Sequence, residues 1–341
     1  MAAARKPKPL SVLIVGCGAI AGGYDEGRAG RAVFSHAGAY RAHGGFRLAA
    51  CVEPNAARRR RFMAHWKVAR GFATLAECRR AGLAFDVASV CVPTAAHEAT
   101  LNALLAMPVK AVFAEKPLTD DLAASRRIVR AYAKARRPLA VNYLRRWDPA
   151  MLALKKDIAT GRWGRVQNVV AHYGKGLFNC GSHVVDLLGF LWGPLAPRAA
   201  LRVLGDHTAA DPTVDALFAG PGGVPAYLIG TDSRRFFDFE IALTTDKGRI
   251  VIEEQGQAMR IRPVLGSPVF AGYRVIDRGR WFGTGFDQAM AAAAANLHGR
   301  VTRGETLLSD GRSALAAQEA CAGIMARAKT GAKRKKPRGT R

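Results

Sequence analysis

The sequence SVLIV at residues 11–15 is followed directly by GCGAIA at residues 16–21. Five strand-forming residues before two closely spaced glycines predict a strand, a sharp turn and then a helix. In this pattern Gly16 makes the bend, Gly18 lets the main chain approach a pyrophosphate, and the small Ala21 allows close packing of helix and strand. Free N–H groups at the helix N-terminus then favour an anion. We therefore predict a dinucleotide-binding fold, with an ordinary strand–turn–helix as the alternative.

The composition is that of a globular protein with more than one domain. At 341 residues the chain suits two domains better than one, and a hydrophobic fraction of 49% supplies a core. No apolar stretch of about 18 residues is free of charge, so we expect no membrane span and no membrane partner. The six cysteines include no C-x-x-C pair, which favours free thiols in a reducing cytoplasm.

The chain is strongly basic, with a net charge of +26. Seven basic residues lie in a tail at 329–341 and three in a tail at 1–9, so most of the excess lies on the body of the protein. A basic surface favours phosphorylated or acidic ligands and non-specific contact with nucleic acid. A compositional bias toward Ala and Arg, visible at 56–61, is the alternative. We expect the tail at 329–341 to be disordered.

Apolar strands alternate with helices up to about residue 142. Near-continuous apolar strands separated by helices predict a parallel sheet that is covered on both faces. A polar stretch, 22–45, separates the first strand from the second. The expected strands are 11–15, 46–52, 85–92, 110–114 and 139–141, and the expected helices are 56–67, 97–107 and 121–135. Residues 10–142 are thus predicted to be a dinucleotide-binding Rossmann domain.

Beyond Trp147 the pattern changes to strands that alternate polar and apolar residues. Alternation predicts an antiparallel or mixed sheet with one covered face. We therefore predict an α/β protein with a second α/β domain at residues 143–328. The expected strands are 166–173, 199–204, 214–218, 226–229, 236–244, 249–253 and 259–263, and the expected helices are 151–160, 184–191, 286–301 and 309–329.

Glu53 ends the second predicted strand. An acidic side chain at this position accepts hydrogen bonds from ribose hydroxyls and repels a 2′-phosphate, which favours NAD over NADP. The four arginines at 58–61 lie close by in the sequence and would instead welcome that phosphate, so NADP stays open. A surface position at the entry of the next helix is the alternative role for Glu53.

The tripeptide Glu115-Lys116-Pro117 follows a predicted strand at its carboxyl end. Open α/β sheets bind their ligands at this edge. A lysine there can hydrogen-bond a substrate hydroxyl and stabilise the negative charge that develops as a hydride leaves. Lys116 is therefore a candidate catalytic residue.

A second candidate segment runs from Tyr173 to Asp186. Asn179 and His183 are four residues apart before an apolar helix, so a helical turn would place both on one face. Histidine can take a hydroxyl proton near neutral pH, and a capping or core role is the alternative. The other histidines show no metal-ligand spacing with the cysteines, so we expect no metal site.

These motifs together resemble the Gfo/Idh/MocA family, named for glucose–fructose oxidoreductase, inositol dehydrogenase and the rhizopine-catabolism protein. The resemblance spans about residues 10–328. Family members combine a Rossmann domain with an α/β domain whose open mixed sheet often forms the oligomer interface. They oxidise or reduce ring hydroxyls of sugars, inositols or nucleotide-sugars with NAD(P). The motifs that carry the resemblance are the strand with its Gly16-x-Gly18 turn, Val92-Pro93-Thr94 with His97, Glu115-Lys116-Pro117 and Gly181-x-His183-x-x-Asp186.

The resemblance implies a role for each matching residue. In the family a lysine of the Glu-Lys-Pro motif, an aspartate and a histidine four residues later surround the reacting hydroxyl. Lys116 and His183 match, whereas Asn179 stands at the aspartate position and cannot exchange a proton. His183 is then the main base, Lys116 orients the hydroxyl, and Asn179 holds it by hydrogen bonding.

The resemblance also implies ligand contacts. We expect the substrate between the domains, where Arg145, Arg146 and Lys175 grip a phosphate or carboxylate, with surface charge as their alternative role. The expected coenzyme contacts are Gly16, Gly18, Ala19, Ile20, Glu53, Val92, Pro93, Thr94, His97 and Glu115, and the expected substrate contacts are Asn142, Tyr143, Arg145 and Lys175.

The sequence thus predicts a cytoplasmic NAD(P)-dependent oxidoreductase, dimeric or tetrameric, that transfers a hydride between nicotinamide and a ring hydroxyl or ketone of a sugar, nucleotide-sugar or inositol. Segments 22–26 and 175–183 resemble a branch of the family linked to surface-polysaccharide sugars. A non-catalytic NAD(P)-binding sensor of the same fold is the alternative, because Asn179 replaces the aspartate. Nucleic-acid binding through the basic body is a third hypothesis.

Overall fold

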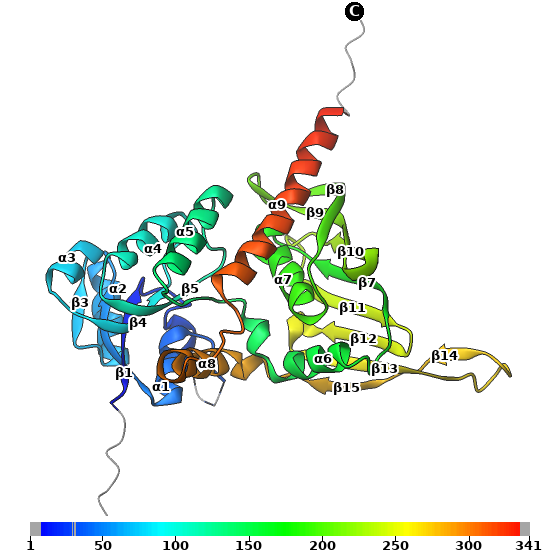
Figure 1. Ribbon diagram of the computed structural model, residues 1–341, viewed down its shortest axis with the longest axis horizontal. Helices are drawn as coiled ribbons and strands as arrows, with labels where there is room; N and C mark the ends of the chain where they lie inside the picture. The colour runs from blue at the N-terminus through cyan, green and yellow to red at the C-terminus, as the bar shows by residue number, and fades with distance from the viewer. Residues whose placement is uncertain (1–7, 29, 31, 335–341) are drawn as a thin grey trace, which may run out of the picture. The chain divides into compact units, whose positions relative to one another are not determined.

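The computed structural model describes residues 8–28, 30 and 32–334, with side chains up to residue 330. The chain divides into two compact units (Figure 1). The first unit contains the chain up to Trp147 together with Asp287–Leu315, and the second contains Asp148–Phe286 and the chain from Ala316. Of the predicted tails at 1–9 and 329–341, residues 1–7 and 335–341 lie outside the described residues.

The first unit is built on a six-stranded parallel sheet with the order β3-β2-β1-β4-β5-β6. Its strands are β1 (Leu10–Val15), β2 (Phe46–Val52), β3 (Arg70–Phe72), β4 (Phe85–Val90), β5 (Val109–Ala114) and β6 (Leu139–Val141). The chain reverses its direction of travel across the sheet between β1 and β4. Such a switch point is where doubly wound sheets bind ligands, outside the carboxyl ends of the strands.

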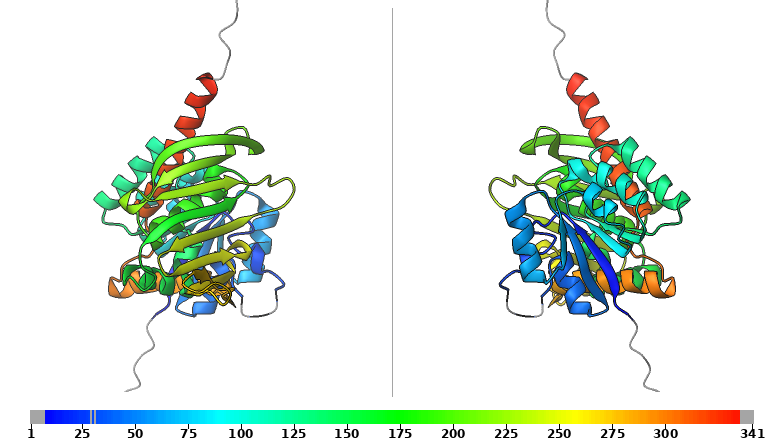
Figure 2. Two further views of the ribbon diagram at one scale, coloured as in Figure 1. Left: turned by 90° about the vertical axis from the view of Figure 1, so that its right-hand side faces the viewer. Right: turned by 90° about the vertical axis from the view of Figure 1, so that its left-hand side faces the viewer.

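The predicted parallel sheet with two covered faces is confirmed. The side chains of Val12, Leu13, Ile14, Val87 and Ala88 are fully buried, as expected for strands with helices on both sides. Figure 2 shows helices on both sides of this sheet. They are α1 (His36–His43), α2 (Ala56–Trp66), α3 (Leu75–Arg80), α4 (His97–Leu105), α5 (Leu122–Lys134) and α8 (Ala289–Arg303).

The helix expected directly after the glycine-rich turn is interrupted, which corrects the prediction. Residues 19–22 form turns and Gly23–Asp25 a short 3₁₀ segment, and α1 begins only at His36, inside the stretch expected to be polar and irregular. The N–H groups of His36 and Ala37 donate to the carbonyls of Ile20 and Ala21, at 3.1 and 2.9 Å. Residues up to Ala21 therefore form the first turn of a helix that continues at His36, and residues 22–35 form a loop between the two parts.

Two further differences come from weak local patterns. Strand β3 and helix α3, at residues 70–80, were not expected, because Arg70, Arg79 and Arg80 hide any apolar periodicity there. Helix α8 was expected in the second domain but belongs to the first unit. Its apolar face, which includes Met290 and Leu297, is buried in the same cluster as β1 and β2, and that burial fixes its place.

The second unit contains a nine-stranded mixed sheet with the order β14-β13-β12-β11-β7-β10-β9-β8, in which β15 also pairs with β13. Only the pair β7–β10 is parallel, so the prediction of a mainly antiparallel mixed sheet is confirmed. The strands are β7 (Val166–Tyr173), β8 (Ala196–Thr208), β9 (Asp211–Ala219), β10 (Pro225–Gly230), β11 (Phe239–Thr245), β12 (Gly248–Glu253), β13 (Ala258–Gly266), β14 (Arg274–Ile276) and β15 (Arg280–Gly283).

One face of this sheet is covered, as alternation in the sequence predicted. In β7 the side chains of Val169, Ala171 and Tyr173 are buried, while Val170 and His172 between them are half-buried. Helices α6 (Pro149–Ala159) and α7 (Ser182–Leu191) belong to the same unit. Helix α7 buries eight of its ten residues.

The last helix, α9 (Gly311–Arg334), spans the end of the first unit and continues into the second. It extends past residue 329, where the disordered tail was expected to begin, because Ala, Arg and Lys favour helix. No helix in the described part of the chain is long and apolar enough to cross a membrane. All six cysteines are free and buried, which confirms the prediction of free thiols.

Candidate active site

Gly16 ends β1 in a conformation that other residues avoid. Its φ is +86°, and a Cβ added there would lie 2.7 Å from the carbonyl oxygen of Cys91, just after β4. The Cys91 N–H also donates to the carbonyl of Val15, at 2.8 Å. The turn is thus pressed against the end of β4, and only glycine satisfies both the angle and the contact.

Gly18 has the opposite surroundings. No atom lies within 4 Å of the position that its Cβ would take, so the main chain is open on this side. Within the described residues, the N–H groups of Gly18, Ala19 and Ile20 donate to no protein acceptor. An exposed row of N–H groups at the first turn of a split helix fits a pyrophosphate, which agrees with the predicted coenzyme contacts.

Asp25 fixes the excursion that splits this helix. Its carboxylate accepts hydrogen bonds from the N–H groups of Phe34 and Ser35, at 3.0 and 2.9 Å, and from the Ser35 hydroxyl. Ser35 in turn caps α1 by accepting from the Gly38 N–H. One carboxylate therefore holds both ends of the loop and keeps the helix aligned with the glycine-rich turn.

Glu53 lies at the end of β2 and is only 4% exposed, so the alternative of a surface position is wrong. Its Oε2 accepts from the Cys17 N–H at 3.1 Å, and its Oε1 accepts from the Asn55 N–H at 3.0 Å. Oε1 also accepts a long bond of 3.5 Å from Arg58, so the second lone pair of Oε2 is the acceptor that Glu53 keeps for a ribose hydroxyl. The same side chain also fixes the glycine-rich turn.

A cavity of about 450 Å³ lies between the glycine-rich turn and the start of α2. The arginines near it are partly neutralised: Arg61 pairs with Glu26 at 2.7 Å, and Arg58 approaches Glu53 at 3.5 Å. Arg59 donates to the carbonyl oxygen of Glu53. The lining residues are Cys17, Gly18, Ala19, Gly23, Tyr24, Glu26, Asn55, Ala57, Arg58 and Arg61.

His97 begins α4 and is 1% exposed. Its Nδ1 lies 2.8 Å from the carbonyl oxygen of Pro117, and its Nε2 lies 3.0 Å from that of Val92. The ring therefore connects the segment Val92-Pro93-Thr94 with the segment Glu115-Lys116-Pro117, two of the predicted ligand-binding segments. This contact makes His97 a positioning residue for the carboxyl edge of the sheet.

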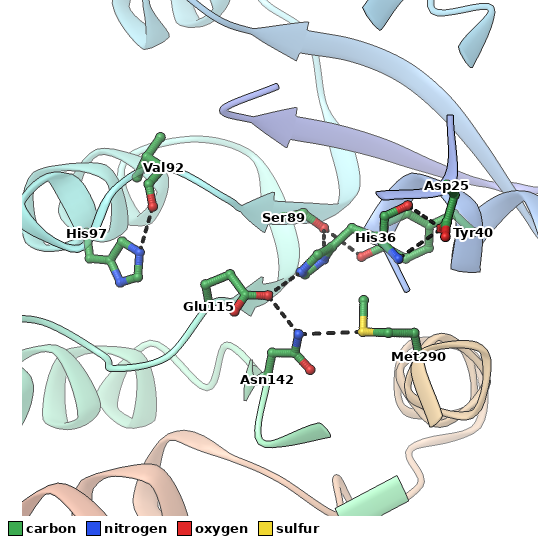
Figure 3. A network of polar contacts seen from close by, with 10 residues as sticks. Asp25, His36, Tyr40, Ser89, Val92, His97, Glu115, Asn142 and Met290 are labelled. Atoms are coloured by element: carbon green, nitrogen blue, oxygen red, sulfur yellow. Dashed lines mark hydrogen bonds and ion pairs between the residues drawn. The ribbon is translucent and has the colours of Figure 1, made fainter. Parts of the chain in front are cut away.

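A buried polar network surrounds Glu115, directly after β5 (Figure 3). Its Oε1 lies 2.9 Å from Nε2 of His36 and accepts from Nδ2 of Asn142 at 2.7 Å. On its other side, the His36 ring lies 3.1 Å from the hydroxyl of Ser89, which bonds to Tyr40 at 2.7 Å. These residues come from α1, β4, β5 and the end of β6, so the network ties four elements together.

The network keeps Glu115 ionised. Burial alone would raise the pKa of Glu115, but the hydrogen bond and charge of His36, the hydrogen bond from Asn142 and the charge of Lys116 hold it below its usual range. The peptide bond after Lys116 is cis. Because the network anchors Glu115, the residue before Lys116, the main chain at Lys116 is held in one place.

Asn142, Tyr143, Arg145 and Arg146 follow β6 and are all buried. The surface-charge alternative for Arg145 and Arg146 is therefore wrong, and Arg146 donates to the carbonyl of Leu308 at 3.2 Å. The Oδ1 of Asn142 is buried and has no hydrogen-bond partner among the described residues. An unpaired buried acceptor is costly, and in a side chain bonded to Glu115 it suits a ligand donor.

In the second unit a single turn of π-helix, Leu177–Gly181, runs into α7. Asp211, at the start of β9, accepts from the N–H groups of Phe178 and Asn179, at 2.7 and 2.9 Å. The predicted helical turn is therefore present, with Asn179 in the π segment and His183 in the first turn of α7. Single π turns in helices are frequent at functional sites.

Lys175 precedes this turn and is exposed, with a φ of +64°. Its N–H donates to Asp206 at 3.0 Å. Partial burial raises the pKa of Asp206, but hydrogen bonds from Thr213, Lys175 and Ser233 outweigh this and hold it far below the usual range. Asp206 and Asp211 thus fix the segment that carries Lys175, Asn179 and His183.

The structure brings the predicted residues together in two sets, one in each unit. Sequence reasoning missed the residues that support both sets, namely Asp25, His36, Asp206 and Asp211. His36 was considered only as a metal ligand, and no local pattern links it to Glu115, 79 residues away. No group of three metal-ligating side chains occurs among the residues described.

The first unit is therefore a dinucleotide-binding Rossmann domain with a lysine at the carboxyl edge of its sheet. Comparison with known proteins indicates the family that this domain resembles. Residues 10–143 match the family model GFO_IDH_MocA, described as "Oxidoreductase family, NAD-binding Rossmann fold", which confirms the resemblance of this domain to that family, the NAD-binding fold and the prediction of an oxidoreductase.

Individual relatives extend the likeness beyond that domain. An inositol 2-dehydrogenase from Rhizobium meliloti (strain 1021) is 28% identical over 255 residues, which cover 68% of this chain and 75% of that protein. The structure of the WlbA dehydrogenase from Bordetella pertussis, in complex with NADH and UDP-GlcNAcA, matches with a TM-score of 0.76 and 20% identity over 95% of this chain and 98% of that one. An oxidoreductase from Agrobacterium radiobacter, in complex with NAD+, L-tartaric acid and magnesium, matches with a TM-score of 0.72 and 17% identity over 95% and 97%. The two-domain fold is thus shared over nearly the whole chain.

Proposed function

We propose that the protein is an NAD-dependent dehydrogenase that transfers a hydride between the coenzyme and a ring hydroxyl or ketone of a sugar, a nucleotide-sugar or an inositol. The observation that carries the proposal is the open, N–H-lined turn at Gly18 on the same sheet edge as the anchored Lys116. The relatives support the substrate class, because one is named an inositol 2-dehydrogenase and another was solved with UDP-GlcNAcA.

Residues of the first unit would hold the coenzyme. The pyrophosphate would lie on the N–H groups of Gly18, Ala19 and Ile20, and Glu53 would accept from a ribose hydroxyl. A buried carboxylate repels a 2′-phosphate, and Arg58 and Arg61 already face Glu53 and Glu26, so we propose NAD rather than NADP. Val92, Pro93 and Thr94, fixed by His97, and Glu115 would border the nicotinamide, which supplies the hydride-accepting carbon when bound.

Three residues would act on the substrate hydroxyl. His183 would take the hydroxyl proton as general base, since imidazole titrates near neutral pH. Lys116 would donate a hydrogen bond to the same oxygen and stabilise the charge that develops on it. Asn179 would hold the hydroxyl without exchanging a proton.

Other polar side chains would hold the rest of the substrate. The unpaired Oδ1 of Asn142 would accept from a second hydroxyl, which explains why a buried acceptor lacks a protein partner. Tyr143 and Arg145 follow it in the chain, and Arg145 would bind an anionic group, as would the exposed Lys175. The cytoplasmic location and the dimeric or tetrameric state stay predictions.

The test is to follow NADH absorbance with the full chain, NAD+ and a panel of inositols, sugars and nucleotide-sugars. We expect turnover of at least one member, a loss of at least about 100-fold in kcat for Lys116→Met, and unchanged NADH binding in that variant. Lys134→Met, on the exposed end of α5, is the matched control and should keep full activity. Equal activity of both variants would contradict the assignment of Lys116.

A second candidate function is a sensor that binds NAD(H) without turnover. It is favoured by one observation, the asparagine at position 179 where the family has an aspartate. The same assay separates the two proposals. NADH binding with no turnover across the panel, together with no gain of turnover in Asn179→Asp, would support the sensor.

A further inference from the structure

The first unit has a second cavity that the proposed function does not use. Its volume is about 470 Å³, within the range of small-molecule sites. The lining comes from the end of α5, the start of β6, the end of α8 with the loop behind it, and the start of α9. The residues are Val129, Tyr132, Ala133, Arg136, Arg137, Pro138, Leu139, Arg300, Thr306, Leu307, Asp310, Gly311 and Arg312.

This cavity lies at the opposite edge of the parallel sheet from the proposed coenzyme site. Arg136 and Arg137 directly precede β6, so they lie at its amino end. The glycine-rich turn and Lys116 follow β1 and β5, and therefore lie at the carboxyl ends of strands that run parallel to β6. A ligand in this cavity would leave the coenzyme turn free.

Four guanidinium groups line the cavity, against one carboxylate. That carboxylate, Asp310, is engaged locally, because its Oδ1 accepts from the Ser313 N–H at 2.8 Å. Arg137 and Arg300 donate to the carbonyl oxygens of Leu104 and Gly304, at 2.6 and 3.1 Å. These bonds fix the two side chains without neutralising their charge.

Arg136 and Arg312 complete the charged wall. In the part of the chain that the structure describes, neither guanidinium makes a hydrogen bond or an ion pair, and both side chains are exposed. Elsewhere in this unit, by contrast, Arg58, Arg61 and Arg127 each face a carboxylate. The cavity thus gathers an excess of positive charge that the protein itself does not balance.

Most of the remaining lining is apolar, and part of it is buried. Tyr132 and Leu139 are buried at 1% and 5% exposure, and the Tyr132 hydroxyl donates to the Leu101 carbonyl at 2.8 Å. A concave apolar floor below a rim of guanidinium groups is typical of a small-molecule site and differs from the extended flat surface that a nucleic acid would need.

We propose that this arginine cavity binds a small organic oxyanion, carrying a phosphate or at least two carboxylates, at a site separate from the coenzyme and the substrate. The guanidinium fork matches the geometry of phosphate and carboxylate groups, and each such pair is a charge-assisted hydrogen bond. Arg136 and Arg312 would donate paired hydrogen bonds to the anion. Arg137 and Arg300, which are held by main-chain carbonyls, would add positive charge at fixed positions.

Titration calorimetry on the full chain, saturated with NAD+, tests the proposal. The probes are pyrophosphate and citrate, each against a buffer of matched ionic strength, and the tighter probe identifies the preferred anionic group. We expect one binding event per chain in this cavity, which the cavity variants weaken, in addition to any anion that Arg145 and Lys175 hold at the proposed substrate site. The variant Arg136→Gln with Arg312→Gln should weaken it at least tenfold, and Arg312→Gln alone should weaken it by a smaller factor.

The matched control is Arg79→Gln with Arg80→Gln, which removes two exposed arginines from α3 in the same unit. It should leave the affinity unchanged. Absence of saturable binding, or equal weakening in both double variants, would overturn the proposal, because the effect would then be one of net charge. Displacement of pyrophosphate by a twelve-residue single-stranded oligonucleotide at a lower concentration would also overturn it.

Discussion

The glycine-rich turn after β1 and the Glu115 segment after β5 lie on the same edge of one sheet but are built differently. The turn is fixed by main-chain geometry, with Gly16 pressed against the carbonyl of Cys91. The Glu115 segment is fixed by side chains, through His36 and Asn142. The glycine spacing that makes the turn is written in adjacent residues, although its contact with Cys91 is not, whereas the Glu115 segment depends on side chains far apart in the chain. An added side chain should therefore disrupt the turn by steric clash, whereas the Glu115 segment should be disrupted by removal of a charge or of a hydrogen-bond partner.

The largest effect is expected from Gly16→Ala. The new methyl group would lie 2.7 to 2.9 Å from main-chain atoms of Cys91 and Val92, and the alanine would have to adopt a φ of +86°. The free energy of unfolding should therefore fall by at least about 3 kcal/mol. Urea denaturation measures it. Gly44→Ala is the matched control, since Gly44 has a φ of +70° but open space around its Cβ position. That variant should lose only about 1 kcal/mol, and equal losses would refute the steric account.

The next effect concerns the pair His36–Glu115. His36→Phe keeps a ring of similar shape but leaves Glu115 with one hydrogen-bond partner fewer, which should cost about 2 kcal/mol. The sharper measurement is a double-mutant cycle with Glu115→Gln, analysed by urea denaturation at neutral pH. We expect a coupling energy of about 1 kcal/mol or more between the two sites. Additive losses would show that the contact carries no specific energy.

A pH profile sharpens the contrast further. Because folding lowers the pKa of Glu115, its contribution to stability is present above the pKa of the unfolded state, near 4.5, and is lost as the pH falls through the lower folded value. Glu115→Gln should therefore lose less stability than the wild type when the pH is lowered below about 4.5. Gly44→Ala, in which no ionisable group changes, should follow the wild-type slope. Parallel curves for all three proteins would contradict the ionised network.

The smallest effect is expected at the other end of α1. His43 stacks on His298 with ring centroids 4.7 Å apart, and burial, together with the charges of neighbouring residues including Arg303, lowers the pKa of both rings. Groups whose pKa falls on folding bind more protons when unfolded, so stability decreases as the pH drops below about 6.5. His298→Gln should flatten the stability curve between pH 7 and pH 5.5. A curve as steep as that of the wild type would show that this pair does not titrate.

The sequence predicted the elements whose information is local. Strand β1, the turn at Gly16 and Gly18 and the buried strands of the first unit follow from apolar runs and glycine spacing. The alternation in β7 likewise predicted a sheet with one covered face. These patterns are short-range because each describes how neighbouring residues face water or core.

The sequence could not predict the parts that depend on distant contacts. The split of the first helix depends on Asp25 accepting hydrogen bonds from Phe34 and Ser35, which no periodicity reveals. The place of α8 in the first unit depends on the burial of Met290 and Leu297 against strands more than 200 residues earlier. The partners of Glu115 and Asn179 are fixed by the fold, so only their own positions were predictable.

One measurement tests the central claim that the turn at residues 16–21 binds a dinucleotide. Gly18→Val should leave the stability of the coenzyme-free protein within about 0.5 kcal/mol of the wild type, because the added side chain enters open space. In a fluorescence titration the same variant should bind NADH at least tenfold more weakly than the wild type, since the valine would enter the space proposed for the pyrophosphate. NADH binding that is equal in both proteins, or absent from the wild type, would contradict the account.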